Sequence, residues 1–248
     1  MEDYVALGDA QLLADVVIRS DHVRARTGRG ELSSAIALEV FRQGAFLIAH
    51  QHMRVPLDWH FITKNAVLRW SRWLPSFPAS GEMRYQLDVR VDIETKRGRP
   101  FLLMWGLRLL YGGRVVADGE LHGWTVAPAR YRALRRTALA APERPARPQT
   151  PQGESGAIVE WDDHDPFLLN RPGDHVVSMI LIDAVLRAVN AEEIRLRSFE
   201  MEFRRFAERT VPVYLLVNTD HAGVSNVTFT QSGEVVAVAS TSSEPYAV

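Results

Sequence analysis

Two stretches of the chain are apolar on nearly all sides, as expected for helices that are buried in a core. They are residues 33–52, SSAIALEVFRQGAFLIAHQH, and residues 178–190, SMILIDAVLRAVN. Each is followed by several runs in which apolar and polar residues alternate, which is the period of a strand with one buried face. The pattern therefore predicts one long helix followed by four strands, twice in the same chain.

The predicted strands are residues 60–70, 83–97, 101–113 and 114–124 in the first half and 198–208, 211–220, 224–233 and 234–242 in the second. The phrase GGRVVADGE at residues 112–120 is matched by SGEVVAVAS at residues 232–240, which indicates an internal duplication. A helix buried on most sides suits a sheet wrapped around it. The fold class that we expect is α+β, a double hotdog fold of two tandem repeats, each a central helix wrapped by an antiparallel sheet.

A proline-rich segment separates the two halves. Its prolines include Pro142, Pro145, Pro148 and Pro151. Their spacing prevents a helix or a sheet from continuing through the segment, which is typical of a linker. The predicted organisation is an N-terminal hotdog repeat at residues 1–128, a linker at 129–156 and a C-terminal hotdog repeat at 157–248.

Composition narrows the partners and the compartment. The 29 basic and 30 acidic residues nearly cancel, so net charge favours neither a nucleic acid nor a membrane as partner. The chain has no cysteine, which excludes disulfides and thiolate metal sites. The acidic N-terminal residues do not form a signal peptide, and no apolar run is long enough to span a bilayer. We expect a soluble cytoplasmic protein that needs no metal.

Three phrases together resemble the A-factor biosynthesis family of double hotdog proteins, which acts in the gamma-butyrolactone signalling of streptomycetes. They are LEVFRQGAFLIAHQHMRVPLDWHFI at residues 38–62, DPFLLNRPGDHVVSMILIDAVLRA at 165–188 and SFEMEFRRFAE at 198–208. The resemblance implies an acyltransferase that moves a beta-ketoacyl group from acyl carrier protein to the hydroxyl of dihydroxyacetone phosphate. The ester then cyclises to a butenolide phosphate, the precursor of the signalling molecule, and no cofactor is needed.

Charged residues on the two apolar helices are the first candidates for this chemistry. Glu39 and Asp183 occupy corresponding positions, and we expect them to be catalytic, with Glu39 facing a cavity. Arg42, Gln43 and Arg187 are candidates for binding the substrate or its phosphate, because arginine pairs well with phosphate. The alternative is structural, since the i, i+3 and i, i+4 spacings of these charges also suit ion pairs within one helix.

The turn that enters the second helix carries two more candidates. His175 lies where many hotdog enzymes place a catalytic histidine or aspartate, and Asp174 next to it is suited to orienting the ring or to binding substrate. Alternatively, both merely hydrogen-bond the turn. Tryptophans suited to lining an acyl tunnel, although more often found in cores, are Trp59, Trp70, Trp73, Trp105, Trp124 and Trp161.

The second helix departs from the family pattern. Relatives carry glutamate and arginine three residues apart, whereas this chain has Asp183 and Leu186 there. Arg187 points about 100° further round an ideal helix. The first helix keeps the pattern in Glu39 and Arg42, so we expect two unequal sites.

Two other classes of function are compatible with the same fold. One is a different enzyme acting on acyl carrier protein or coenzyme A thioesters, either a dehydratase or a thioesterase. The other is a non-catalytic protein that binds an acyl chain or a partner protein. Carboxylates facing a cavity would favour an enzyme.

Overall fold

The computed structural model describes residues 4–8, 11–22, 24–28, 30–96, 99–139, 156–165, 174–190 and 194–244. In chain order its elements are β1 (Tyr4–Gly8), β2 (Gln11–Arg19), α1 (Ser34–Gln51), β3 (His60–Trp70), β4 (Glu82–Lys96), β5 (Arg99–Tyr111), β6 (Arg114–Val126), α2 (Pro128–Leu139), β7 (Ala157–Ile158), α3 (Ser178–Ala188), β8 (Arg195–Phe203), β9 (Tyr214–Thr219), β10 (Val224–Gln231) and β11 (Glu234–Glu244). The predicted helices and strands of both halves are confirmed. Strands β1, β2 and β7 and helix α2 are additional.

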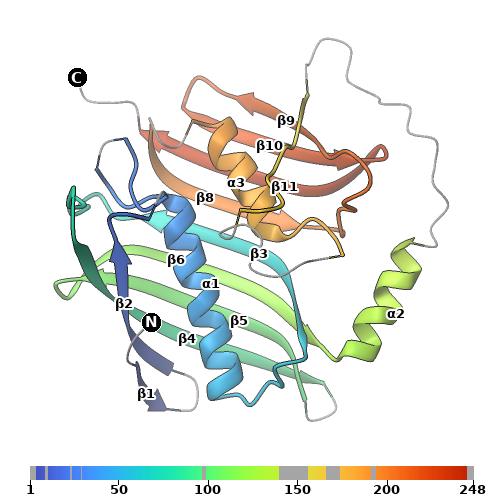
Figure 1. The fold of residues 1–248 in the computed structure, drawn as a ribbon, viewed down its shortest axis with the longest axis horizontal. Helices are drawn as coiled ribbons and strands as arrows, with labels where there is room; N and C mark the ends of the chain where they lie inside the picture. Colours follow the sequence, from blue (N-terminus) through green and yellow to red (C-terminus); the bar gives the residue numbers. More distant parts are fainter. Residues whose placement is uncertain are drawn as a thin grey trace.

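The strands form one 11-stranded sheet in the order β1-β2-β4-β5-β6-β3-β8-β11-β10-β9-β7. This order is symmetric about the central β3–β8 pair, because β6, β5 and β4 follow on one side as β11, β10 and β9 follow on the other. Strands β3 and β8 pair antiparallel, as a twofold relation between the halves requires. Figure 1 shows α1 against the N-terminal half of the sheet and α3 against the C-terminal half. The fold is the predicted double hotdog.

The hairpins β5–β6 and β10–β11 support the duplication in detail. Both turn through two residues with positive φ, Gly112 and Gly113 (55° and 77°) in the first and Ser232 and Gly233 (53° and 77°) in the second. Two such residues define the type I′ turn that suits tight hairpins. Both hairpins also have a register shift near the turn, which places Val116 and Val236 at corresponding bulges. The matching sequence phrases therefore fold into matching hairpins.

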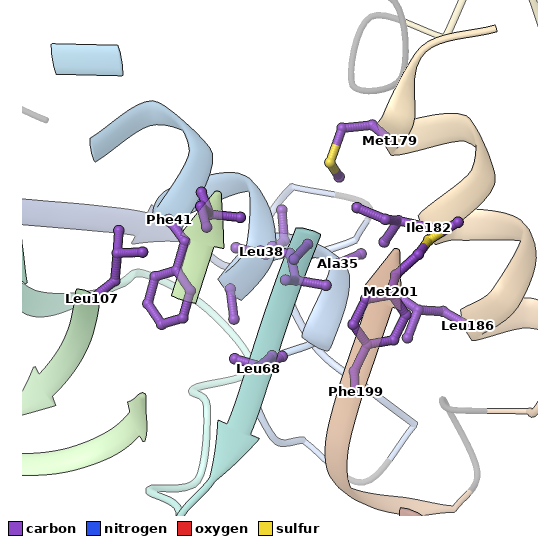
Figure 2. Packing of buried hydrophobic residues seen from close by; sticks show 14 of the residues in the cluster. Ala35, Leu38, Phe41, Leu68, Leu107, Met179, Ile182, Leu186, Phe199 and Met201 are labelled. Carbon is purple, nitrogen blue, oxygen red and sulfur yellow. The ribbon is translucent and has the colours of Figure 1, made fainter. Parts of the chain in front are cut away.

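The core lies between the two helices and the sheet (Figure 2). Leu38 of α1 and Ile182 of α3 face the space between the helices, above Leu68 and Phe199 of the central strands. Helix α1 comes close to the sheet at Gly44, where an added Cβ would lie 2.3 Å from a methyl carbon of Leu87. Close approach of α1 to β4 therefore depends on glycine at this position.

The predicted linker is partly helical. Helix α2 occupies its first part, while the prolines on which the prediction rests lie outside the described residues. Strand β2 was not predicted from the sequence. Its residues Leu13 and Val17 are apolar although they alternate with the buried positions Leu12, Ala14 and Val16, so the sequence shows no clear alternation of apolar and polar residues. In the described part of the chain, no helix is both long and apolar enough to cross a membrane.

Candidate active site

A candidate site lies where the two halves separate. Strands β3 and β8 are paired only over Asn65–Arg69 and Ser198–Glu202. Beyond this pairing, residues 60–64 and 202–207 line a cavity of about 470 Å³, which we call the main cavity. Its charged lining residues are the basic Arg42, Lys64, Arg204 and Arg205 and the acidic Glu202. Three of the four basic residues are paired, Arg42 with Glu39, Arg204 with Glu202 and Arg205 with Glu234.

The N-terminus of α3 opens into the main cavity. Val177 is the N-cap residue and forms no side-chain cap hydrogen bond, and Ser178 and Met179 both line the cavity. Helix geometry leaves the first-turn N–H groups of Ser178 and Met179 without partners inside the helix. Such groups stabilise negative charge, including the oxyanion of an acyl transfer.

His175 also lines the main cavity, immediately before this helix. Its Nδ1 lies 2.8 Å from Oδ1 of Asp174, and the same carboxylate oxygen accepts a hydrogen bond of 2.7 Å from the Tyr131 hydroxyl. Arg135 donates from Nε to the other oxygen, Oδ2, at 2.9 Å. With its proton on Nδ1, His175 keeps Nε2 available as a base.

The surroundings keep Asp174 ionised. Burial alone would raise the pKa of Asp174, but hydrogen bonds from His175, Tyr131 and Arg135 outweigh it and hold the pKa well below its usual range. Burial raises the pKa of Tyr131 above its ordinary value, and its hydrogen bond to Asp174 raises it further. Tyr131 therefore remains a donor, and Asp174 remains an acceptor that orients the imidazole.

Tyr131 and Arg135 come from helix α2, and neither was predicted from the sequence. Arg135 is only 4% exposed and also donates to both carboxylate oxygens of Glu208, at 2.7 and 2.6 Å. His60 stacks on the Tyr131 ring with centroids 3.7 Å apart, and burial is the main cause that lowers the pKa of His60. The i, i+4 spacing of Tyr131 and Arg135 was the available signal, because it places both on one helix face.

The charges on α1 form the ion pair that was the structural alternative to a catalytic role. Arg42 donates from Nε and Nη2 to the two oxygens of Glu39, each at 2.7 Å, and Gln43 donates to Glu39 at 2.9 Å. Arg42 lines the main cavity, but Glu39 does not, and Gln43 is exposed. Glu39 does not line the smaller cavity described below either. The expectation that Glu39 faces a cavity is therefore wrong for both of these cavities. The geometry favours a role in holding Arg42.

The charges on α3 lie away from the main cavity. Arg187 is bonded from Nε to Asp183 at 2.9 Å and from Nη2 to the carbonyl oxygen of Glu160 at 2.8 Å. Asp183 is 4% exposed and also accepts a hydrogen bond from Arg24, which in turn pairs with Asp165 at 2.7 Å. Asp183 and Arg187 line neither cavity described here. Of the predicted site residues, His175 and Arg42 line the main cavity, and Asp174 is linked to it through its contact with His175.

A smaller cavity of about 30 Å³ lies beneath the main cavity, and we call it the inner cavity. The two share Arg42, Phe61 and Ser178 among their lining residues, so they are contiguous. The inner cavity is bounded by α1, by the start of α3 and by Trp105 and Gly123 of the sheet. It extends the site toward the core. Among the described residues, no cluster of three or more metal-binding side chains is placed to hold a metal ion.

Comparison with known proteins identifies relatives. The chain is 25% identical over 209 residues to the 2-oxo-3-(phosphooxy)propyl 3-oxoalkanoate synthase of Streptomyces coelicolor, covering 75% of this chain and 65% of that one. The synthase of the same name from Streptomyces griseus is 25% identical over 208 residues, 75% of this chain and 68% of its own. The resemblance to the A-factor biosynthesis family is confirmed. The chain spans about two thirds of the length of these synthases. No family model matches the chain.

Solved structures agree on the fold. The 12:0-ACP thioesterase from Umbellularia californica superposes with a TM-score of 0.64 at 11% identity, over 94% of this chain and 98% of that one. An acyl-ACP thioesterase from Bacteroides thetaiotaomicron gives 0.63 at 11% identity with the same coverage. At such identity the likeness concerns the fold alone, and function has to be argued from the site.

Proposed function

We propose that this protein transfers a 3-oxoacyl group from a thioester, carried by acyl carrier protein or coenzyme A, to a hydroxyl of dihydroxyacetone phosphate. The observation that carries the proposal is the Asp174–His175 pair beside the uncapped N-terminus of α3, in a cavity with excess basic residues. The names of the distant synthases supply the substrate class. The product is the ester that cyclises to a butenolide phosphate.

The chemistry follows from the placement of these groups. Nε2 of His175 accepts the proton of the attacking hydroxyl as its oxygen bonds to the thioester carbonyl carbon. The N–H groups of Ser178 and Met179 stabilise the oxyanion that forms on the carbonyl oxygen. The C–S bond then breaks, and the proton on His175 passes to the departing thiolate. Asp174 keeps the ring in the required orientation throughout.

The phosphate of the acceptor fits the outer part of the main cavity. Lys64 is exposed and its ammonium lies 5.6 Å from the Trp124 ring centroid, and no carboxylate of the described residues forms an ion pair with it. Arg204, paired with Glu202 at 3.0 Å, lines the same cavity. The sequence-based choice of Arg42 as phosphate anchor is less well supported, because Glu39 already occupies two of its donors.

The test is a product assay with the purified full chain. A 3-oxoacyl thioester and dihydroxyacetone phosphate are incubated with the protein, and the phosphorylated ester or butenolide is sought by mass spectrometry. Wild type should form the product, and His175→Gln should not. His221→Gln, which changes an exposed histidine in the same way, is the matched control.

Release of the free 3-oxo acid without use of the acceptor would instead identify a thioesterase, since water would have taken the place of the hydroxyl. Absence of both products with acyl carrier protein and coenzyme A donors would contradict an enzymatic role for the site.

A further inference from the structure

His60 is a second histidine on the main cavity, and the proposed transfer does not use it. It is the first residue of β3 and is half-buried. Among the described residues, none forms a hydrogen bond with the ring nitrogens of His60, and neither nitrogen is one of the buried polar atoms that lack a partner. The described part of the protein therefore leaves both nitrogens open, and His60 lines the main cavity.

Tyr131 contacts both cavity histidines. The His60 and Tyr131 rings stack with their centroids 3.7 Å apart and an interplanar angle of 8°. The centroid of the Tyr131 ring lies 6.5 Å from that of the His175 ring, and the Tyr131 hydroxyl donates to Asp174. One tyrosine therefore helps to position two imidazoles at the same cavity.

The two imidazoles have different surroundings. His175 is bound to the carboxylate of Asp174, whereas no described carboxylate bonds to His60. Burial is the main cause that lowers the pKa of His60, so its ring is mostly neutral at pH 7. A neutral imidazole accepts a proton at one nitrogen and can return it afterwards. His60 is thus suited to a proton transfer in addition to the one assigned to His175.

The ester formed by the proposed transfer still needs such a proton transfer. Carbon C2 of its acyl group lies between two carbonyl groups, so the C2 protons are far more acidic than those of an ordinary chain. The ketone of the dihydroxyacetone unit is in the same molecule and is the electrophile for ring closure. Closure needs a base at C2 and an acid at the ketone oxygen. With its phosphate toward Lys64, the ester would lie along β3, the strand that also carries His60.

We propose that His60 catalyses this ring closure, so that the protein makes the butenolide phosphate and not only the open ester. The identity of the ester rests on the proposed function. His60 takes one proton from C2, and the carbon bonds to the ketone carbon while the ketone π electrons move to its oxygen. Protonated His60 returns the proton to that oxygen, which gives a tertiary alcohol. His60 then takes the second C2 proton, a carbon–carbon double bond forms, and the hydroxyl group leaves with that proton as water.

Ring closure is tested from the synthetic open ester, so that the result does not depend on the transfer. The 3-oxooctanoyl ester of dihydroxyacetone phosphate is mixed with the full chain, and the butenolide phosphate is followed by mass spectrometry against the rate in buffer. Wild type should accelerate ring closure by about 100-fold or more, as a positioned base does. His60→Gln should lose the acceleration, and His221→Gln, which changes an exposed histidine in the same way, should keep it. Free imidazole should partly restore ring closure in His60→Ala, which a merely structural role of His60 would not allow.

No acceleration by wild type, full acceleration by His60→Gln, or a loss in His60→Ala that imidazole does not restore would overturn the proposal. If the His60 variants do not fold, wild type decides with the 3-oxooctanoyl ester of glycerol 3-phosphate, which has no ketone to attack. In deuterium oxide the protein should speed the exchange of its C2 protons, and exchange at the rate in buffer would equally overturn the proposal. Failure of the transferase itself would appear separately, in the product assay.

Discussion

We call the boundary between the two halves, which runs along β3, β8 and the two core helices, the seam. The duplication relates its two ends, but different side chains occupy them. At one end, the N-terminus of α3 has no side-chain cap and opens into the main cavity. At the other end, Ser33 caps α1 by accepting from the N–H of Ile36 at 3.3 Å. Arg195 and Arg197 donate there to the carbonyl oxygens of Arg72 and Ser71, at 2.7 and 3.1 Å. We call these the open end and the closed end.

Glu39 in the middle of α1 and Asp183 in the middle of α3 also have different partners. At the open end, Glu39 holds Arg42, which lines the main cavity. At the closed end, Asp183 is bound by Arg24 and Arg187, and Leu186 points into the core at the position where the resemblance led us to expect arginine (Figure 2). Under the proposed function, the reaction takes place at the open end alone. The other copy is then available for ion pairs that tie the halves together.

His175→Gln should have the largest effect and would show that chemistry belongs to the open end. Loss of a general base lowers kcat by about 100- to 10,000-fold. The melting temperature should stay near that of wild type, because the His175 side chain is partly exposed at the cavity and is not part of the core. Steady-state kinetics and thermal melts of His175→Gln and of the control His221→Gln measure both. Full activity of His175→Gln would place the chemistry elsewhere.

Asp183→Ala should destabilise the protein at the closed end without lowering kcat. Removing Asp183 takes away the buried carboxylate that Arg24 and Arg187 share and leaves Asp165 as the carboxylate partner of Arg24, so it should cost roughly 3 kcal/mol of the free energy of unfolding. Urea unfolding measures this, with kcat referred to folded protein. Arg187→Ala, at the exposed side of the same cluster, should cost under about 1 kcal/mol. Loss of turnover at unchanged stability would instead make the closed end a working site.

Leu186→Arg restores the family pattern and should fail to create a second site. Leu186 is 7% exposed and faces the core, so an arginine there would bury a charge without a partner and destabilise the protein by roughly 3 kcal/mol. Ala188→Arg adds the same charge at an exposed position of α3 and should be nearly neutral. A stable Leu186→Arg variant with raised activity would contradict the view that only the open end works.

Glu39→Gln distinguishes a structural carboxylate from a catalytic one. Because the pair with Arg42 is largely buried, loss of the charge should lower the free energy of unfolding by about 1–3 kcal/mol. Activity should fall modestly and in parallel, as Arg42 loses its position in the cavity wall. Loss of turnover with an unchanged melting temperature would restore Glu39 as the catalytic base.

The smallest expected effect is a pH dependence of stability at the open end. The pKa of His60 is lowered from its ordinary 6.5, mainly by burial, so the unfolded chain binds this proton more readily than the folded one. The contribution of His60 to stability is therefore complete above pH 6.5 and is lost as the pH falls through the lower, folded pKa. Urea midpoints between about pH 5 and 8 should show a weaker decline for His60→Gln than for wild type. Equal slopes would assign the decline to other groups.

The sequence by itself determined the double hotdog fold. Periodicity is a local property, so two helices and eight strands could be predicted. The i, i+3 spacing of Glu39 and Arg42 allowed both a catalytic role and an ion pair, and the structure contains the ion pair. His175 was chosen as a candidate from its place before α3, and it lines the main cavity. Helix α2 was not predicted, because the prolines that follow it led to the prediction of a linker over all of residues 129–156.

Only the tertiary structure decided how distant segments meet. Arg24 reaches Asp183 across 159 residues, and Tyr131 reaches Asp174 across 43. No spacing rule covers such contacts, because they depend on how the two halves and α2 pack together. Packing also turns Leu186 into the core. Which end of the seam stays open is therefore set by a few long-range ion pairs and hydrogen bonds, and not by the repeated pattern that both halves share.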